Sequence, residues 1–357
     1  MKKILALILA LVMVFALVAC GSSNKPADNK GDDATIAPLT IKFSSTFQQQ
    51  ETGGVIIQHF IDKVGELSGG AITVEIAWGG TLFDAMGELD AVLDGVVDMI
   101  ALGHMPHLDT LPYLSFPGFA PNGTQAALDY FNHLMFDNAE TSALIQGEAA
   151  NLGIKYLNII PGGANAFCVQ KPFATIDDMV ANSAAFGNMD AAIFESLGFQ
   201  VTTVFPPDVY DGLNRGLIDG TQMALAPMLA MAWYEVAPYW CLDNTYAAGN
   251  PFTVNLDWWE GLSKAQQECI QKAADDTETF AAGLYDSAIA GDIKTIEDAT
   301  GNKFVELSQA DKDKFWAATF EAKAADALRR AEAHNITEGM TTILEAAAKF
   351  TGYDWKH

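Results

Sequence analysis

Residue types that carry out metal or redox chemistry are few and widely spaced in this chain. His104 and His107 are close enough to share a metal ion, but no further clustered ligand accompanies them. Cys168, Cys241 and Cys269 lie far apart, so buried free thiols are expected, although one disulfide among them is possible. A nucleophile elbow, a phosphate loop and a zincin helix are also absent from the sequence. The sequence therefore favours a binding protein over an enzyme, with no metal and no cofactor.

The N-terminus has the features of a secretory signal. Lys2 and Lys3 precede an unbroken apolar run over residues 4–19, and Cys20 follows this run directly. A basic start, a short apolar middle and small residues at the cleavage position are typical of a signal peptide, here residues 1–19. The Leu-Val-Ala-Cys ending resembles the bacterial lipobox, which implies cleavage before Cys20 and a lipid on its thiol. An uncleaved membrane anchor is the alternative, but the run falls just short of the ~17–25 residues that a span requires.

Residues 20–38 predict a flexible linker between the lipidated cysteine and the first folded residue. The segment is rich in Ser, Asn, Lys, Asp and Gly and contains no large apolar cluster. It therefore cannot bury enough surface to offset the entropy lost on ordering. The implied location is extracytoplasmic, with the folded body anchored to the bacterial cell membrane through Cys20.

The composition of the remaining chain predicts a large, acidic globular protein. Of the 357 residues, 50% are hydrophobic, and the formal net charge is −25. Such a charge repels nucleic acid and anionic lipid surfaces, so neither is an expected partner. About 320 residues follow the linker, which at roughly 150 residues per domain predicts two domains.

The body of the chain alternates predicted strands with predicted helices. Strands are expected at residues 40–43, 72–76, 97–102, 166–169, 183–186 and 200–205. Helices are expected at residues 57–67, 86–93, 189–197 and 208–215, and from Thr124 and Ser308 onward. An unusually long helix is expected to begin at Ser263, where Gln266 completes a capping box, and to run past Ile289. We therefore expect two α/β domains, with mostly parallel sheets covered by helices on both faces.

The densest motifs lie between residues 176 and 228. Ile-Asp-Asp-Met at 176–179 precedes a strand, and a Leu-Gly pair precedes the next strand. Residues 206–213 read Pro-Pro-Asp-Val-Tyr-Asp-Gly-Leu, and residues 215–222 read Arg-Gly-Leu-Ile-Asp-Gly-Thr-Gln. Leu-Asp-Gly-Val-Val-Asp-Met at 93–99 echoes the second motif. In this order the motifs resemble the solute-binding proteins of tripartite ATP-independent periplasmic (TRAP) transporters, over nearly the whole chain after the linker.

The resemblance implies a periplasmic-binding-protein-like fold of two α/β domains, with hinge strands between them and a long helix spanning both. The expected domains are residues 39–162 with about 249–288, and residues 163–248 with about 289–357. A small polar organic solute is expected to bind in the cleft between the domains, which close around it by hinge motion. The membrane subunits of the transporter are then the expected partner of the closed form.

The same resemblance indicates candidate residues around the cleft, which are aromatic or polar and uncharged. They are Thr46, Phe47, Trp78, His104, Asn165, Asn188, Tyr210 and Met223. Trp78 and Phe47 either form a wall for the ligand or pack on the core, and Tyr210 either lines the cleft or packs at the domain interface. Asp98 and Asp219 are expected to hold loop geometry rather than to contact ligand.

The chain departs from the family where an arginine usually binds a carboxylate. The matching position is Ala185, and Asn165 stands near a second frequent arginine position. The only arginines are Arg215, Arg329 and Arg330, and Arg215 is expected to be solvated at a helix end. Without the guanidinium fork, a neutral, zwitterionic or cationic ligand is favoured. The alternatives are an organic acid bound through other donors, a receptor that signals to a partner instead of feeding a permease, or a secreted α/β hydrolase.

Overall fold

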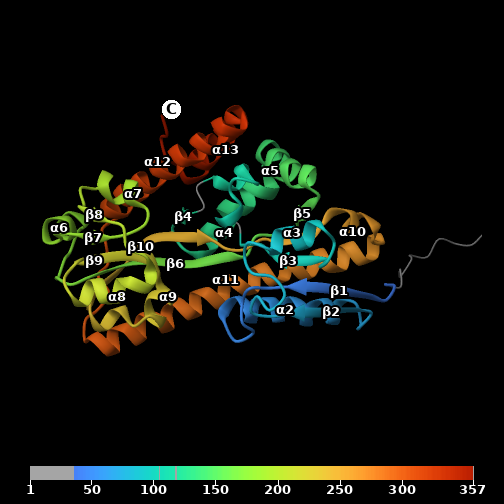
Figure 1. Cartoon of the computed structure of the whole chain (residues 1–357), viewed down its shortest axis with the longest axis horizontal. Helices are drawn as coiled ribbons and strands as arrows, with labels where there is room; N and C mark the ends of the chain where they lie inside the picture. The colour runs from blue at the N-terminus through green and yellow to red at the C-terminus, as the bar shows by residue number, and fades with distance from the viewer. Residues whose placement is uncertain (1–35, 104, 117–118, 357) are drawn as a thin grey trace, which may run out of the picture. The chain divides into compact units, whose positions relative to one another are not determined.

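The structure, a computed structural model, describes residues 36–103, 105–116 and 119–356. Two β-sheets with helices around them make up this part of the chain (Figure 1). The predicted α/β class is therefore confirmed. No helix in the described stretches combines the length and apolarity that crossing a bilayer requires.

The first sheet has five strands in the order β2-β1-β3-β11-β5. The strands are β1 Leu39–Ser44, β2 Ile72–Ala77, β3 Met99–Ala101, β5 Ile154–Tyr156 and β11 Phe252–Asn255. The helical segments that follow its strands are α2 Thr52–Leu67, α3 Glu88–Leu93, η1 Met105–His107, η2 Pro112–Ser115 and α10 Leu256–Gly261.

The second sheet has six strands in the order β4-β10-β6-β9-β7-β8. The strands are β4 Phe119–Pro121, β6 Pro161–Val169, β7 Phe186–Gly187, β8 Val201–Thr202, β9 Gly220–Ala224 and β10 Tyr239–Ala248. Its connecting helices are α6 Ile176–Asn182, α7 Ala191–Ser196, α8 Pro206–Asn214, α9 Leu225–Ala230 and η4 Trp233–Glu235. Between β4 and β5 lie α4 Thr124–Asn132, the π-helix η3 His133–Asp137 and α5 Ala139–Leu152.

The prediction of mostly parallel sheets is wrong, because both sheets are mixed. β11 runs antiparallel to β3 and β5, and β10 runs antiparallel to β4 and β6. The reason is the path of the chain. β6 carries it from the first sheet into the second and β10 carries it back, so these neighbouring strands must run in opposite directions.

Helix α11, Lys264–Thr300, is the long helix that the sequence predicted from Ser263. The Ser263 hydroxyl accepts from the Gln266 backbone N–H, and the Gln266 side chain accepts from the Ser263 backbone N–H, so the predicted capping box is confirmed. The helix has 37 residues. Its Ala273 packs in the core of the first sheet and its Ile296 in a core of the second, so one helix supports both sheets.

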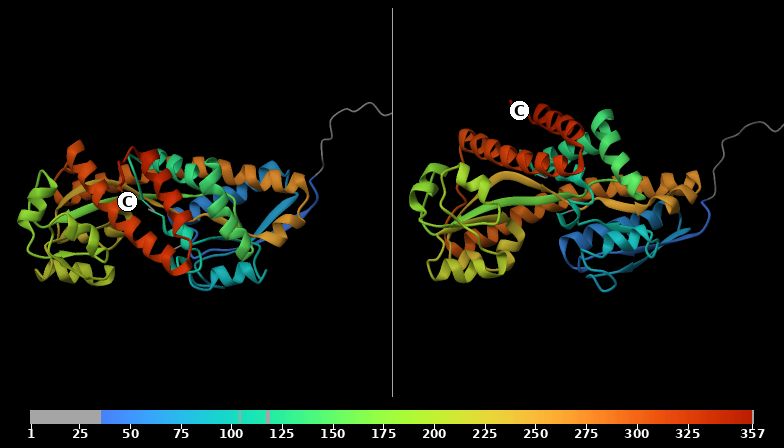
Figure 2. Two further views of the ribbon diagram at one scale, coloured as in Figure 1. Left: turned by 90° about the horizontal axis from the view of Figure 1, so that it is seen from above. Right: turned by 45° about the horizontal axis from the view of Figure 1, so that its top comes forward.

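The second sheet is buried on both faces, and β6 alternates between them. Phe167 and Val169 point into one core, while Ala166 and Cys168 point into the other. Helix α12, Gln309–His334, covers the first of these faces and α11 covers the second, as Figure 2 shows. The thiols of Cys168, Cys241 and Cys269 are free and buried, as predicted.

The C-terminal helices pack on elements from both halves of the chain. Phe315 of α12 lies in the aromatic core of the second sheet. Ile343 of α13, Thr337–Thr351, packs in the same core as Phe131 of α4. The predicted division of the chain at residue 162 remains a prediction.

Candidate functional site

A cavity of about 280 Å³ opens beside the second sheet, where β6, β9 and the segment after β7 meet. Its polar lining comes from Asn165 on β6, Asn188 and Asp190 after β7, and Gln222 on β9. Met223 and Trp233 supply apolar surface. Convergent amides on an apolar wall are typical of sites for small polar molecules.

Asn188 holds two segments of the cavity wall together. Its side-chain amide donates to the carbonyl of Gln222 at 2.8 Å, and its side-chain oxygen accepts from the backbone N–H of Asp190 at 2.8 Å. The residue is 8% exposed. The amide is therefore fixed at the cavity surface, rather than free to turn in solvent.

A buried carboxylate lies behind this wall. Asp243 on β10 accepts from the Gln222 amide at 2.5 Å and from the Thr245 hydroxyl and backbone N–H, both at 2.7 Å. The Asn165 amide donates to the same Thr245 hydroxyl at 3.0 Å. Burial raises the pKa of Asp243 to about 6, against the lowering effect of these hydrogen bonds. The sequence analysis missed Asp243, whose only local signal is a polar run inside a strand.

The β10 backbone is irregular at this carboxylate. The register with β6 shifts between Leu242 and Tyr246, and Asn244 has a positive φ of 67°. The irregularity turns Thr245 toward Asp243, so that its N–H and hydroxyl both reach one carboxylate oxygen.

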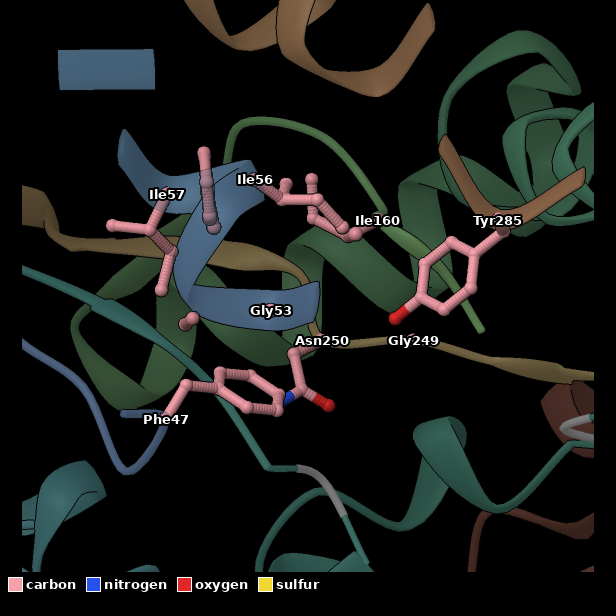
Figure 3. A pocket seen from close by; sticks show the side chains of 10 residues that line it. Phe47, Gly53, Ile56, Ile57, Ile160, Gly249, Asn250 and Tyr285 are labelled. Atoms are coloured by element: carbon pink, nitrogen blue, oxygen red, sulfur yellow. The ribbon is translucent and has the colours of Figure 1, made fainter. Parts of the chain in front are cut away.

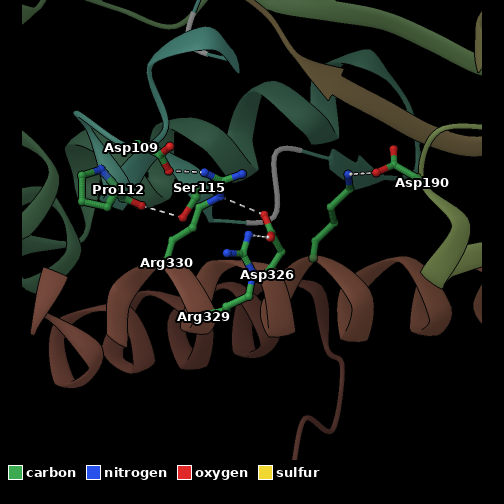
Figure 4. Close-up of polar contacts among 8 residues, drawn as sticks. Asp109, Pro112, Ser115, Asp190, Asp326, Arg329 and Arg330 are labelled. Carbon is green, nitrogen blue, oxygen red and sulfur yellow. Dashed lines mark hydrogen bonds and ion pairs between the residues drawn. The ribbon is translucent and has the colours of Figure 1, made fainter. Parts of the chain in front are cut away.

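No arginine, lysine or histidine is among the described residues that line this cavity. A cation of α12 pairs with one lining residue, because the Lys323 ammonium lies 2.9 Å from the Asp190 carboxylate (Figure 4). The same nitrogen lies 5.2 Å from the centre of the Phe119 ring, which also lines the cavity. Sequence reasoning missed Lys323, because a lysine on a helix surface carries no signal of its partner.

The three arginines pair with aspartates elsewhere. Arg330 bonds Asp109 and Asp326, and Arg329 bonds Asp326, all outside the cavity (Figure 4). Arg215 follows α8 and pairs with Asp211 at 3.3 Å, with 70% of its side chain exposed. The predicted solvated position of Arg215 is therefore confirmed.

A second, smaller cavity of about 40 Å³ lies near the first sheet. Figure 3 shows the Phe47 ring beside Asn250, with the Tyr285 hydroxyl on the opposite side. The Phe47 ring also packs against Gly53, where an added Cβ would come within 2.6 Å of it. A space of this size has room for ordered water.

The predicted site residues do not all come together. Asn165, Asn188 and Met223 line the larger cavity, and Phe47 lines the smaller one. Thr46, Trp78 and Tyr210 are half-buried and line neither. The Tyr210 hydroxyl donates to Glu235 at 2.8 Å, and Trp78 packs on the core of the first sheet. His104 lies outside the described residues.

Three further predictions concern residues that flank the cavity or lie apart from it. Ala185 does not line the cavity, and its backbone N–H and carbonyl bond Asp219. Asp219 therefore holds the loop before β7, as predicted. Asp98 instead accepts from the backbone N–H of Lys42 within β1 at 2.8 Å, so it bonds a strand rather than a loop. His107 lies 2.8 Å from the carbonyl of Ala85, and no group of three metal-ligating side chains occurs among the described residues.

Comparisons with known proteins agree with this architecture. A family model described as bacterial extracellular solute-binding protein, family 7 (DctP), matches residues 43–325. The C4-dicarboxylate-binding periplasmic protein DctP of Rhodobacter capsulatus is 23% identical over 291 residues, covering 78% of this chain and 84% of that protein. The ectoine-binding periplasmic protein TeaA of Halomonas elongata is 26% identical over 171 residues, covering 46% of each chain.

Solved structures show the same fold. A TRAP periplasmic solute-binding protein from Ochrobactrum anthropi superimposes with a TM-score of 0.73 at 20% identity, covering 88% of this chain and 97% of that one. Ectoine-binding TeaA in its apo state gives a TM-score of 0.72 at 18% identity, covering 87% and 99%. The family model, the aligned relatives and the shared two-sheet fold lead to one conclusion: the chain belongs to the DctP family of bacterial extracellular solute-binding proteins, which serve TRAP transporters.

Proposed function

We propose that this protein is an extracytoplasmic lipoprotein that captures a small polar organic solute and delivers it to the membrane subunits of a TRAP transporter. The observation that carries the proposal is the family match together with a cavity walled by fixed amides. The relatives named above are solute-binding proteins, which supports a role without catalysis over the α/β hydrolase and the signalling receptor. Cys20 anchors the protein to the cell membrane, and nucleic acid is not a partner.

The solute binds in the larger cavity. Asn165, Asn188 and Met223 were selected from the sequence by motif position, and their convergence on one cavity supports this assignment. Phe47, Trp78 and Thr46 belong to the first sheet and its loops. In this proposal they reach the solute only when the domains close by hinge motion at β6 and β10.

The solute is neutral, zwitterionic or cationic rather than a simple dicarboxylate. The cavity lining lacks arginine, and the three arginines are paired elsewhere. A buried carboxylate without a paired cation loses its hydration uncompensated, by several kcal/mol. The closest alternative is an organic acid held through other donors, which the nearby Lys323 ammonium supports.

Family relatives are named for dicarboxylates and for a solute that is not a dicarboxylate. The Rhodobacter capsulatus relative is named for C4-dicarboxylates and the Halomonas elongata relative for ectoine. Family membership alone is therefore compatible with either ligand class, and the choice rests on the residues of this cavity.

The test is to purify the protein without denaturation and identify any co-purified solute by mass spectrometry, then to titrate candidate solutes while small-angle scattering follows the radius of gyration. We expect a polar solute to bind and to reduce the radius of gyration as the domains close. Tight binding of succinate or a sugar acid, with no response to amines or neutral solutes, would contradict the ligand class. Turnover of an ester or glycoside, lost on substitution of cavity residues, would contradict the function itself.

A further inference from the structure

One ion pair joins a residue of the cavity wall to α12, a helix that lies much later in the sequence. The Lys323 ammonium of α12 lies 2.9 Å from the Asp190 carboxylate and 5.2 Å from the centre of the Phe119 ring. Asp190 and Phe119 both line the larger cavity. Although the Lys323 backbone belongs to another element, its charge therefore lies next to two residues of the cavity lining.

The pair can be opened by a solute without breaking the fold. Asp190 precedes α7 as its N-cap residue, but its side chain makes no capping hydrogen bond. Its side chain is 52% exposed and that of Lys323 is 20% exposed. Ion pairs with this exposure contribute little to stability, because water solvates the separated charges. Each partner can therefore exchange the other for a solute group of the same charge.

The side-chain amides of the cavity wall already have partners. The amides of Asn165, Asn188 and Gln222 donate within the wall, and the Asp243 carboxylate accepts from three donors. Among the described residues, the charges that can meet a solute directly are therefore those of Asp190 and Lys323.

We infer that Asp190 and Lys323 select a zwitterionic solute, with the solute cation on the Asp190 carboxylate and the solute carboxylate on the Lys323 ammonium. This inference rests on the proposed function and deepens it. The reason is that a zwitterion replaces the one broken ion pair with two, whereas each other charge class forms at most one. An anion that takes Lys323 leaves Asp190 unpaired beside a like charge, and a cation that takes Asp190 leaves Lys323 unpaired. A neutral solute leaves the pair closed and gains no charge interaction.

Two neighbours favour the same orientation. The buried Asp243 adds negative charge behind the cavity wall, which attracts the solute cation toward this side. The Phe119 ring also lines the cavity, and an aromatic face attracts a cation. The solute carboxylate is then left on the side of α12.

The first experiment ranks a library of small polar solutes by thermal shift on the purified protein. The library contains zwitterions, anions, cations and neutral molecules in isosteric sets. One set is glycine betaine, 3,3-dimethylbutanoate, choline and 3,3-dimethylbutan-1-ol. Another set is L-proline, cyclopentanecarboxylate, L-prolinol and cyclopentylmethanol. We expect zwitterions to give the largest shifts, and the best one to bind at least about tenfold more tightly than its anionic isostere by calorimetry.

The second experiment compares Lys323→Met and Asp190→Asn with the wild type on the best set. Lys323→Met is expected to make the zwitterion bind no more tightly than the cation. Asp190→Asn is expected to make the zwitterion bind no more tightly than the anion. The matched controls are Lys314→Met and Asp177→Asn, which remove another ion pair of α12, the one with α6. These controls are expected to keep the wild-type ranking, because neither residue lines the cavity.

The results distinguish failure of the zwitterion inference from failure of the proposed solute-binding function. If only anions or neutral solutes bind, or if Lys323→Met weakens all four isosteres equally, the inference is wrong while the solute-binding function stands. If nothing in the library binds, both the inference and the proposed function fail.

Discussion

The Gln222 side-chain amide donates a 2.5 Å hydrogen bond to the Asp243 carboxylate, although β6 lies between their two strands. Gln222 lines the larger cavity, while Asp243 is completely buried. The bond therefore connects the wall that we propose holds the solute with the strand that returns the chain to the first sheet. A change in the cavity wall reaches the interior of the fold through this contact.

Gln222→Ala is expected to lower the free energy of unfolding by about 1–3 kcal/mol, because Asp243 loses a donor while it stays buried. Urea unfolding at pH 7.5 measures the loss. Below the Asp243 pKa of about 6 the loss is expected to shrink, because the protonated carboxyl needs fewer donors. The control is Gln309→Ala, which removes an exposed amide–carboxylate contact on α12 and should change stability by less than about 0.5 kcal/mol. Equal losses in the two variants would disprove the role given to Asp243.

The protein is expected to be more stable at pH 5 than at pH 8.5. Burial raises the pKa of Glu88 to about 8, and the pKa values of Glu148 and Glu278 to about 7, from an ordinary 4.5. Between the unfolded and folded pKa values the folded state binds more protons, so stability falls as pH rises through this interval. Carboxylates with lowered pKa values, such as Asp276 beside His59, oppose this trend only near and below their ordinary pKa of 3.8. Differential scanning calorimetry across pH 5–9 measures the trend.

Glu88→Gln isolates one of these groups. One Glu88 oxygen accepts from the Ser44 hydroxyl at 3.3 Å, and the other has no partner in the described structure. The neutral amide is expected to flatten the fall in Tm between pH 7 and 9. Glu75→Gln, on the exposed side of β2, is the control and should leave the profile unchanged. A Tm that rises steadily from pH 5 to pH 8.5 in the wild type would contradict the prediction.

Asn188→Ala is expected to weaken solute binding at least about tenfold, because the amide fixes the cavity wall on both sides. Calorimetry with the solute identified by co-purification measures the affinity, and circular dichroism checks that the variant is folded. Asn182→Ala is the matched control, since the Asn182 side chain, at the end of α6, donates to the carbonyl of Pro172 and does not line the cavity. An unchanged affinity in Asn188→Ala would remove this residue from the site.

Cys20→Ala is expected to release the protein from the membrane fraction, because the lipid on this thiol is the proposed anchor. Mass spectrometry of the mature N-terminus gives the direct readout, and it should find a lipid-modified Cys20 as the first residue. Cys269→Ala leaves the anchor in place and serves as the control. An intact Met1, or cleavage elsewhere with an unmodified Cys20, would overturn the anchoring proposal.

Local signals in the sequence determined much of the fold. The capping box of Ser263 and Gln266 predicted where α11 begins, and hydrophobic periodicity predicted most of the strands and helices. These features depend on interactions between residues that are close in sequence, so they can be predicted from the sequence alone.

Only the tertiary structure decided the strand directions and the charges at the cavity. β6 and β10 run in opposite directions because the chain enters and leaves the second sheet on them, which no local pattern encodes. Lys323 and Asp190 are 133 residues apart, and the packing of α12 decides which carboxylate lies near this lysine. Asp243 became a buried acceptor because a strand irregularity and Gln222 supplied its donors. Packing brings together side chains that are far apart in the sequence. The charges near this cavity are therefore decided by the tertiary structure.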